Sequence, residues 1–267
     1  MSQFFNQNQI EKIISLALEA GEIAVNFQKS NNFEIIKKAD NTSVTSADIT
    51  ISEFINKNLS QDFPDIPIIC EEGKLRQAND IFWLIDPIDG TSSFIDGSNE
   101  FAINIALIKN RKAIFGLIYA PLFQSGKMIF SNHQDEVILQ NKNGRKRILP
   151  FKKSVQNSLR IITSPRTKDH EIKNYIAQFR KNFLDNFVVE RLSSAIKFFR
   201  ILENDADLYL HFRPSMEWDS AAGQALIELM NGRVKTMSLA QDKIFLGDEL
   251  IYKKDNFLNQ SFVTFIN

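Results

Sequence analysis

Apolar residues near the start of the chain recur every three or four positions, which is the spacing of a helix with one buried face. This pattern covers residues 8–29 and predicts an amphipathic helix there. A polar, turn-rich stretch over 37–48 follows, which fits either a flap or a solvated loop. Thr45 or Ser46 can cap a second helix, because their hydroxyl oxygens accept hydrogen bonds from free backbone N–H groups.

From residue 66 onwards the pattern changes to short apolar runs, which are typical of strands. We predict strands at 66–70, 81–85, 101–108, 112–120, 127–130 and 135–140. The breaks between the later runs are short enough for hairpins, so this part of the chain should form an antiparallel sheet.

Strands and helices alternate beyond about residue 155, which is typical of an α/β unit. The predicted strands are 160–164, 186–190 and 207–212, and the predicted helices lie near 168–182, 193–203 and 220–230. We therefore expect two lobes, residues 1–155 and residues 156–267, with their boundary near 150–158.

The composition favours a folded chain that does not bind nucleic acid. Of the 267 residues, 43% are hydrophobic, so a sizeable core can form. Lys plus Arg and Asp plus Glu both number 32, which gives zero net charge. General nucleic-acid and membrane-surface binders are usually basic, so this balance argues against both classes.

The cysteine content and the apolar runs bear on location. Cys70 is the single cysteine, so no internal disulfide can form, which suits a reducing cytosol. The first residues lack the basic and apolar regions of a secretory signal. No apolar run approaches the length of about 18 residues that a membrane-spanning helix needs. We expect a cytoplasmic protein without integral membrane association.

Carboxylates stand where three predicted segments end. Glu71 and Glu72 end one strand, Asp86 and Asp89 end the next, and Asp219 follows a polar turn. Carboxylates grouped at low dielectric repel one another, and some would have to take up protons. A hard divalent cation removes this problem, since Mg²⁺ binds through a few carboxylates and substrate phosphate oxygens. The pattern therefore indicates a magnesium site.

The turn that follows the strand at 81–85 fits this use. Pro87 fixes its own φ angle and has no N–H, so the chain must leave the hydrogen-bond ladder there. Both aspartates can then point to one place, with the Ile88 carbonyl exposed between them. The N–H groups and hydroxyls of the next three residues could hold phosphate oxygens; these are Gly90, Thr91 and Ser92.

The same residues allow other interpretations of this turn. An Asp-Pro-x-Asp-Gly sequence is also an ordinary surface turn. An EF-hand is excluded, because Ile88 and Gly90 occupy the third and fifth positions from Asp86. Zinc is disfavoured, because the three histidines are scattered and Cys70 is alone. Walker A, G-x-G-x-x-G and G-x-S-x-G motifs are missing from the sequence.

Together these segments resemble the inositol monophosphatase superfamily of Mg²⁺-dependent phosphatases. WLIDPIDGTSSF (83–94) matches the first motif of the superfamily, and EWDSAAGQALIELMNGRV (217–234) matches the second. CEE (70–72) and VTSAD (44–48) match its two other acidic motifs, and the four motifs stand in the expected order. The likeness is closer to the bacterial 3′(2′),5′-bisphosphate nucleotidases of the CysQ type, through KADNTSVTSAD, EFAINIALI, IYAPL, DADLY and FLNQSF.

The resemblance implies a two-metal site. Glu71 would bind the first Mg²⁺ and take part in catalysis, Asp86 would bridge both ions, and the Ile88 carbonyl would complete the first site. Asp89 and Asp219 would hold the second ion. A third ion, brought by the 37–48 stretch, is an open alternative.

The resemblance also implies how water and substrate are held. Asp48 and Thr91 match the pair that orients the attacking water, with Asp48 accepting from the Thr91 hydroxyl and the Thr91 oxygen accepting from the water. The residues that would contact the scissile phosphate are Asp89, Gly90, Thr91, Ser92 and Asp219.

A Ser-Ser-x-x-Lys segment of the nucleotidase subgroup matches Ser193, Ser194 and Lys197. The resemblance assigns Ser194 and Lys197 to the second, non-reacting phosphate of the substrate. An exposed helical lysine is the plain alternative. The chain departs from the subgroup at three positions, where Gly, His and Arg are usual; these are Leu192, Thr167 and His211.

The resemblance implies hydrolysis of adenosine 3′,5′-bisphosphate to AMP and phosphate. An inositol-1-phosphate or other sugar-phosphate phosphatase is the first alternative, and a non-catalytic metal- or nucleotide-binding relative is the second. The implied fold is a layered αβαβα sandwich, with an antiparallel-sheet lobe and a smaller mixed-sheet α/β lobe. The expected partner is a small nucleotide or sugar phosphate, and the expected assembly is a monomer or homodimer. Peripheral association with the inner face of the cell membrane is an alternative to a free cytoplasmic location.

Overall fold

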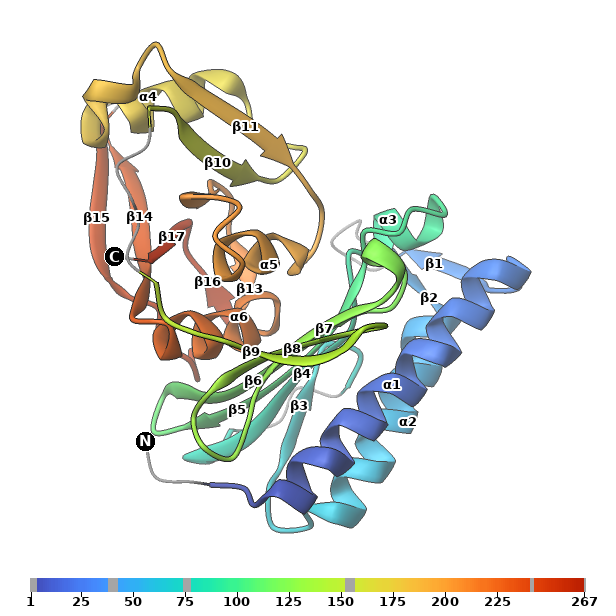
Figure 1. Cartoon of the computed structure of the whole chain (residues 1–267). Coiled ribbons are helices and arrows are strands. Elements are labelled where there is room, and N and C mark those ends of the chain that lie inside the picture. Colours follow the sequence, from blue (N-terminus) through green and yellow to red (C-terminus); the bar gives the residue numbers. More distant parts are fainter. Residues whose placement is uncertain (1–3, 38–42, 74–77, 152–156, 241–242, 267) are drawn as a thin grey trace.

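Helices and sheets alternate in layers through the molecule (Figure 1). The computed structural model describes residues 4–37, 43–73, 78–151, 157–240 and 243–266. Helices α1 (Gln7–Ser30) and α2 (Ser46–Asp62) cover a first sheet, and α5 (Ile196–Leu202) and α6 (Glu217–Leu229) separate it from a second sheet. Helix α4 (Asp169–Phe179) covers the outer face of the second sheet. The predicted αβαβα sandwich is confirmed.

Capping residues fix the starts of the N-terminal helices. Asn6 and Gln9 form a capping box at α1, in which each side chain accepts the backbone N–H of the other residue. Thr45, and not Ser46, caps α2, and Asp48 closes its capping box. The described ends of the polar stretch form a short hairpin of β1 (Ile35–Lys37) and β2 (Ser43–Thr45), while residues 38–42 lie outside the described residues.

The first sheet has seven strands within the described part of the chain. Their spatial order is β3 (Ile68–Cys70), β4 (Ile81–Asp89), β5 (Ala102–Lys109), β6 (Lys112–Ala120), β7 (Lys127–Ser131), β8 (Val137–Asn141) and β9 (Gly144–Ile148). All neighbours are antiparallel, as predicted, except β3 and β4, which are parallel. Side chains of β5 alternate across the sheet, so Ile103 and Ile105 pack toward α1 and α2 while Ala106 packs toward α6.

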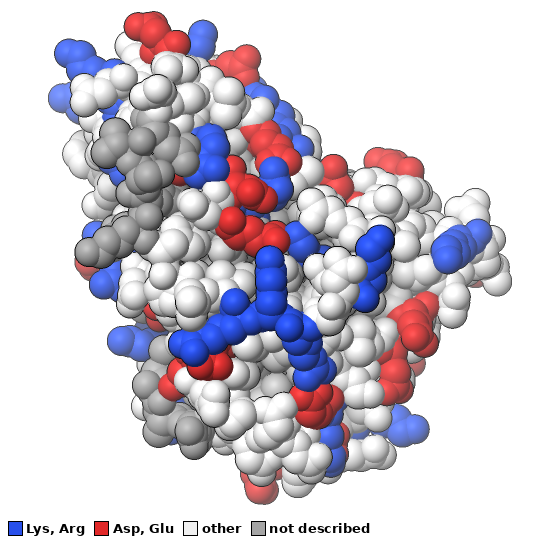
Figure 2. All heavy atoms as spheres, viewed as in Figure 1, with Lys and Arg blue, Asp and Glu red and all other residues white. Residues whose placement is uncertain are grey.

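The sequence pattern did not predict strand β9, because its residues are mostly charged. Arg145, Lys146 and Arg147 are exposed on this edge strand, and Figure 2 shows a band of basic side chains in this region of the surface. Charged side chains on an edge strand discourage pairing with another sheet edge. Arg145 also pairs with Glu11 of α1 at 2.6 Å, so the strand is tied to the first helical layer.

The second sheet is mixed, as predicted, and has six strands within the described residues. Their spatial order is β11 (Phe187–Arg191), β10 (Leu159–Thr163), β12 (Leu208–His211), β17 (Phe262–Ile266), β14 (Gly232–Ala240) and β15 (Lys243–Glu249). Strand β10 is parallel to both neighbours, and the other pairs are antiparallel. The strands after residue 232 were not predicted from the pattern.

The two sheets share helix α6, and small residues allow the close contact. A Cβ atom on Gly116 of β6 would lie 2.2 Å from the Ala222 carbonyl oxygen, and one on Gly223 would lie 2.3 Å from the Phe198 ring of α5. Ala221, Ala222 and Leu226 belong to a single buried cluster that takes residues from both sheets. The position of α6 is therefore fixed on both sides.

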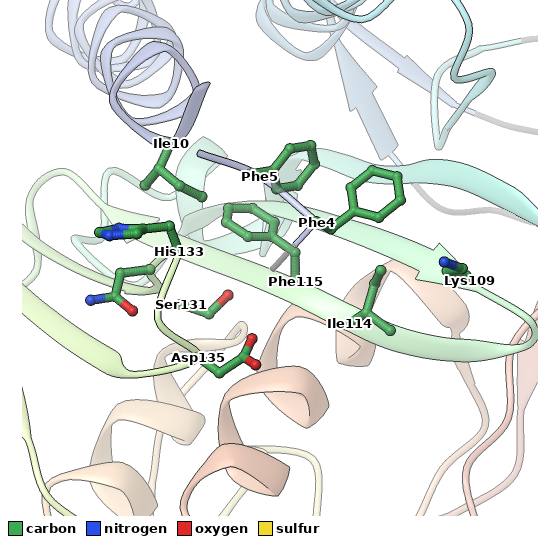
Figure 3. A pocket seen from close by; sticks show the side chains of 10 residues that line it. Phe4, Phe5, Ile10, Lys109, Ile114, Phe115, Ser131, His133 and Asp135 are labelled. Carbon is green, nitrogen blue, oxygen red and sulfur yellow. The ribbon is translucent and has the colours of Figure 1, made fainter. Parts of the chain in front are cut away.

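A small cavity lies at the end of the first sheet that is remote from Asp86 and Asp89 (Figure 3). It measures about 150 Å³ and is lined by Phe4, Phe5 and Phe115, with Lys109 and His133 among its polar residues. Phe5 stacks on Trp83 at a centroid distance of 5.4 Å. Strand β4 pairs Ile81 with Lys109 at this end and Asp89 with Ala102 at the other. This cavity is therefore an aromatic packing site, with Asp135 in its lining, that lies apart from Asp86 and Asp89.

Candidate active site

The first two aspartates flank an irregularity in strand β4. Asp86 pairs with Asn104 of β5 and Asp89 pairs with Ala102, so three steps along β4 match two along β5. Pro87 and Ile88 lie in the extra length and leave the ladder, as the sequence predicts. The Ile88 N–H donates to Asp86 Oδ1 at 3.1 Å, which closes the turn locally.

Asp219 reaches the same place from the other half of the chain. The carboxylate oxygens of Asp86, Asp89 and Asp219 lie within 4.8 Å of one another. Asp219 stands in the first turn of α6, where its Oδ2 accepts the Met216 N–H at 2.8 Å. Glu71 joins this group from the end of β3, where its N–H donates to the Ile85 carbonyl at 3.1 Å. We call Glu71, Asp86, Asp89 and Asp219 the acidic cluster.

The acidic cluster is electrostatically strained without a cation. Burial raises the pKa of Asp86 well above its ordinary value, and the charges of Glu71, Asp89 and Asp219 raise it further. Burial and the Asp89 charge do the same for the pKa of Asp219. The cluster and the nearby Ile88 carbonyl offer only oxygen donors, which are the ligands that Mg²⁺ prefers. The residues present therefore fit magnesium.

Asp48 and Thr91 lie together beside the acidic cluster. The Thr91 hydroxyl is 3.3 Å from Asp48 Oδ1 and 3.2 Å from the Ile88 carbonyl oxygen, so its single proton can be donated to either. The other Asp48 oxygen accepts the Thr45 N–H at 2.7 Å. Burial raises the pKa of Asp48. Since Asp48 is buried and held by the start of α2, the first helical layer fixes the position of one of the two acceptors of the Thr91 hydroxyl.

Ser194 and Lys197 approach the cluster at the start of α5. Both are buried, so the alternative of an exposed helical lysine is wrong. The Lys197 ammonium donates to the Ser194 carbonyl and lies 5.4 Å from the centre of the Tyr209 ring. Burial lowers the pKa of Lys197 to about 8, although Asp89, Asp219 and Glu100 oppose this shift. A buried cation thus stands next to the carboxylates.

Comparison with known proteins agrees with this geometry. The family model described as the inositol monophosphatase family matches residues 6–261. The chain belongs to this family.

Relatives within the inositol monophosphatase family carry the name 3′(2′),5′-bisphosphate nucleotidase CysQ. The protein of Escherichia coli O6:H1 is 31% identical over 259 residues, which cover 95% of this chain and 98% of that protein. The protein of Buchnera aphidicola is 32% identical over 237 residues, which cover 86% of this chain and 85% of that protein. The chain is therefore a phosphatase of this family and is similar to its bisphosphate nucleotidases.

Solved structures of the family share the fold. The crystal structure of CysQ from Bacteroides thetaiotaomicron has a TM-score of 0.79 and 27% identity, with 98% of both chains covered. The Thermotoga maritima IMPase has a TM-score of 0.72 and 20% identity, with 97% of this chain and 92% of that chain covered. At that identity the second structure supports the fold alone.

Two of the positions where the chain departs from the nucleotidase subgroup of the family lie near Lys197. The His211 imidazole is bonded to the Tyr209 hydroxyl at 3.1 Å, and burial together with the Lys197 and Arg213 charges lowers its pKa to about 3. His211 is therefore neutral at physiological pH. Leu192 is buried before the turn that leads into α5. The third position, Thr167, is buried and bonded to Thr163 at 2.7 Å.

Arg213 stands two residues beyond His211, but its guanidinium is engaged elsewhere. It is exposed and pairs with Glu171 of α4 at 2.5 Å. Arg213 therefore does not supply a free guanidinium beside Lys197.

Some residues at the site were not predicted from the sequence. The Asn104 amide donates to Asp89 Oδ2 at 3.1 Å, and Asn104 is a single polar residue in an otherwise apolar run, which was an available signal. Glu217 is fully buried at the start of α6 and pairs with Lys254 at 2.6 Å. The Glu100 carboxylate accepts the Ser193 N–H at 2.8 Å. Both glutamates begin segments that carry the family resemblance, EFAINIALI and EWDSAAGQALIELMNGRV, but no role was predicted for either.

Gly90 stands directly before the short helix α3 (Thr91–Ile95), and Ser92 lies in this helix with its side chain exposed. Gly90 has a φ angle of +92°, and an added Cβ would lie 2.9 Å from the Glu100 carbonyl oxygen and 3.2 Å from Ser194 Cβ. We predict that Gly90→Ala lowers the free energy of unfolding by about 1–3 kcal/mol and lowers phosphatase activity at least about 10-fold. Urea unfolding and phosphate release measure the two effects.

Gly97→Ala is the matched control for Gly90→Ala. Gly97 also has a left-handed φ angle, +71°, but an added Cβ would meet nothing within 4 Å. This variant should lose only about 1 kcal/mol and keep its activity, because it carries the backbone penalty without the contact. Equal losses of activity in both variants would show that the close approach at Gly90 is unimportant.

Proposed function

We propose that this protein hydrolyses adenosine 3′,5′-bisphosphate to AMP and phosphate with Mg²⁺. The observation that carries the proposal is the buried Lys197 beside the acidic cluster. The charges of Asp89 and Asp219 stabilise the ammonium, but in this proposal those carboxylates are shared with the metal ions, so the buried cation needs a further anion. A second phosphate would satisfy it. The names of the CysQ relatives support the same substrate class.

In this proposal the acidic cluster holds two metal ions. Glu71, Asp86 and the Ile88 carbonyl would hold the first Mg²⁺, and Asp86, Asp89 and Asp219 would hold the second. When bound, the ions lower the pKa of water and stabilise negative charge on the transferring phosphoryl group. A third ion is outside this proposal, because residues 38–42 of the polar stretch are not described.

Asp48 and Thr91 orient the nucleophile in the proposed reaction. When the Thr91 hydroxyl donates to Asp48, its oxygen lone pair is free to accept a hydrogen bond from a water molecule. That bond leaves a lone pair of the water directed at phosphorus, so positioning accelerates the attack. Backbone N–H groups of Gly90, Thr91 and Ser92 would bind the oxygens of the scissile phosphate.

Ser194 and Lys197 bind the second phosphate in this proposal. Lys197 is rigidly held, because its ammonium bonds the Ser194 carbonyl and lies against the Tyr209 ring. A phosphate near the ammonium would favour its charged form, which counters the effect of burial on its pKa. The neutral His211 contributes hydrogen bonding but no charge to this part of the site.

The proposal is tested by phosphate release with Mg²⁺, measured side by side on adenosine 3′,5′-bisphosphate and inositol-1-phosphate. We expect a kcat/KM at least about 100-fold higher for the bisphosphate, since a second charged contact is worth about 3 kcal/mol. A preference for the inositol ester would keep the phosphatase class and reject the proposed substrate. No release from either would reject both substrates.

Lys197→Met separates the charge of Lys197 from its packing. The methionine keeps the apolar stem between α5 and Tyr209 and removes the ammonium. We predict that KM for adenosine 3′,5′-bisphosphate rises about 10–100-fold, while KM for adenosine 3′-monophosphate changes less than about 3-fold. Initial rates over a range of both substrates measure the difference. Equal changes for both would remove Lys197 from the second-phosphate site.

A further inference from the structure

The turn between β11 and α5 is held by two carboxylates from the other half of the chain. The Ser193 N–H donates to Glu100 Oε2 at 2.8 Å, and the Ala195 N–H donates to Asp89 Oδ2 at 2.5 Å. These donors lie directly before and after Ser194. The turn is therefore fastened on both sides of a single residue.

That residue has an unusual backbone conformation. Ser194 has a φ angle of +54°, in the left-handed region that few residues other than glycine occupy. Such a conformation costs about 1–3 kcal/mol and persists only where the surroundings determine it. The bonds to Glu100 and Asp89 supply this constraint. They also explain why α5 begins at Ile196. The sequence pattern predicted a helix start near residue 193, three residues earlier.

The direction of the Ser194 peptide sets the position of Lys197. The Lys197 ammonium donates to the Ser194 carbonyl, so a change in the turn would move the ammonium. The same turn lies close to Gly90, the first of the three residues proposed to bind the scissile phosphate. A Cβ on Gly90 would meet both the Glu100 carbonyl oxygen and Ser194 Cβ. Glu100, Gly90 and Ser194 thus form one contact between the two halves of the site.

We propose that Glu100 is a positioning residue, whose hydrogen bond to the Ser193 N–H holds Ser194 and Lys197 where they bind the second phosphate of the substrate. The inference rests on the proposed function. Asp89 also holds the turn, by accepting the Ala195 N–H, but it belongs to the acidic cluster as well. Glu100 is outside that cluster, so its substitution tests the turn with the cluster left intact.

Two conservative variants separate the hydrogen bond from the charge. Glu100→Gln keeps the length and an acceptor oxygen but removes the charge, whereas Glu100→Asp keeps the charge and shortens the side chain by one methylene. If the hydrogen bond matters, the glutamine should preserve the function and the aspartate should not. If only the charge near Lys197 matters, the order should be reversed.

The experiment measures KM and kcat for adenosine 3′,5′-bisphosphate and adenosine 3′-monophosphate with the full chain and Mg²⁺. We expect Glu100→Asp and Glu100→Ala to raise KM for the bisphosphate about 10-fold, since a backbone donor left without its acceptor costs about that factor. KM for the monophosphate should change less than about 3-fold in both, and Glu100→Gln should stay near the wild type. Glu136→Ala, which removes a carboxylate paired with Arg147 on the first sheet, is the control and should match the wild type.

A binding measurement gives a second readout without turnover. Calorimetric titration of adenosine 3′,5′-bisphosphate into protein with Ca²⁺ in place of Mg²⁺ should show the same order of affinities. Unchanged KM and affinity in Glu100→Asp would overturn the inference, as would preserved function in Glu100→Asp with loss in Glu100→Gln. If Glu100→Ala does not fold, the Asp and Gln pair still decides. A wild type that neither binds nor hydrolyses the bisphosphate would instead reject the proposed function.

Discussion

Asp89→Asn should lower the turnover of the proposed reaction by about 10³-fold or more at saturating Mg²⁺, with the fold intact. Asp89 Oδ2 already accepts two hydrogen bonds, from the Ala195 N–H and the Asn104 amide. An asparagine oxygen can take over those bonds, so the local structure should survive. The lost charge weakens the second metal site, where the proposed mechanism needs it. Phosphate release and circular dichroism measure the two parts of this prediction.

Asp96→Asn is the control for Asp89→Asn. Asp96 lies on the same segment, just after α3, and is exposed. The Asp96→Asn variant carries the same chemical change outside the acidic cluster, so its activity should equal that of the wild type. Near-normal turnover of Asp89→Asn at saturating Mg²⁺ would disprove the role of Asp89 as a ligand.

Asp86→Asn should abolish activity and at the same time stabilise the metal-free protein. Asp86 is buried, and burial and neighbouring carboxylates hold its pKa well above the value in the unfolded chain. The folded metal-free protein therefore binds a proton that the unfolded chain releases, so its stability falls as pH rises above about 4, the ordinary aspartate value. An asparagine is neutral at every pH. Removing electrostatic repulsion that is kept for function typically raises the free energy of unfolding by about 0.5–2 kcal/mol.

Thermal unfolding with a chelator and with Mg²⁺ tests this prediction. At pH 7 the metal-free Asp86→Asn protein should unfold about 2–6 °C above the metal-free wild type, and this gap should shrink toward pH 4. Mg²⁺ should stabilise the wild type and have little effect on the variant. A variant that is less stable than the metal-free wild type at pH 7 would show that repulsion within the cluster is unimportant.

Local chemistry explains what could be predicted from the sequence. Pro87 must break the ladder wherever it stands in a strand, and the two aspartates around it then diverge from the sheet together. Apolar spacing alone located α1, and the Thr45 cap located α2. The meeting of Asp219 with Asp86 depends on packing across the whole chain. The pattern of carboxylates at the ends of segments indicated it, and the family resemblance assigned each residue its metal ion.

The features that escaped prediction depend on contacts between distant segments. The resemblance assigned Lys197 to the substrate, but no local pattern predicts its burial or its contact with the Tyr209 ring. Glu100 bonds a turn that follows it by more than ninety residues, so the EFAINIALI segment that it opens does not predict this hydrogen bond. Strand β9 contains mostly basic residues and forms because β8 offers it an edge. In each case the tertiary structure overrides local propensity.

Helix α6 has a consequence for the synthesis of the protein. It packs on one face of the first sheet, against β4, β5, β6 and β7, and its Ala221 and Ala225 share a buried cluster with Ala106 and Ile118. The sheet is complete by Ile148, but α6 ends only at Leu229, so a growing chain must carry a bare apolar surface for about eighty residues of translation. Exposed surfaces of this kind attract chaperones and aggregate when unprotected. We expect the nascent chain to need a holding chaperone in that interval, and the yield of folded protein to depend on it.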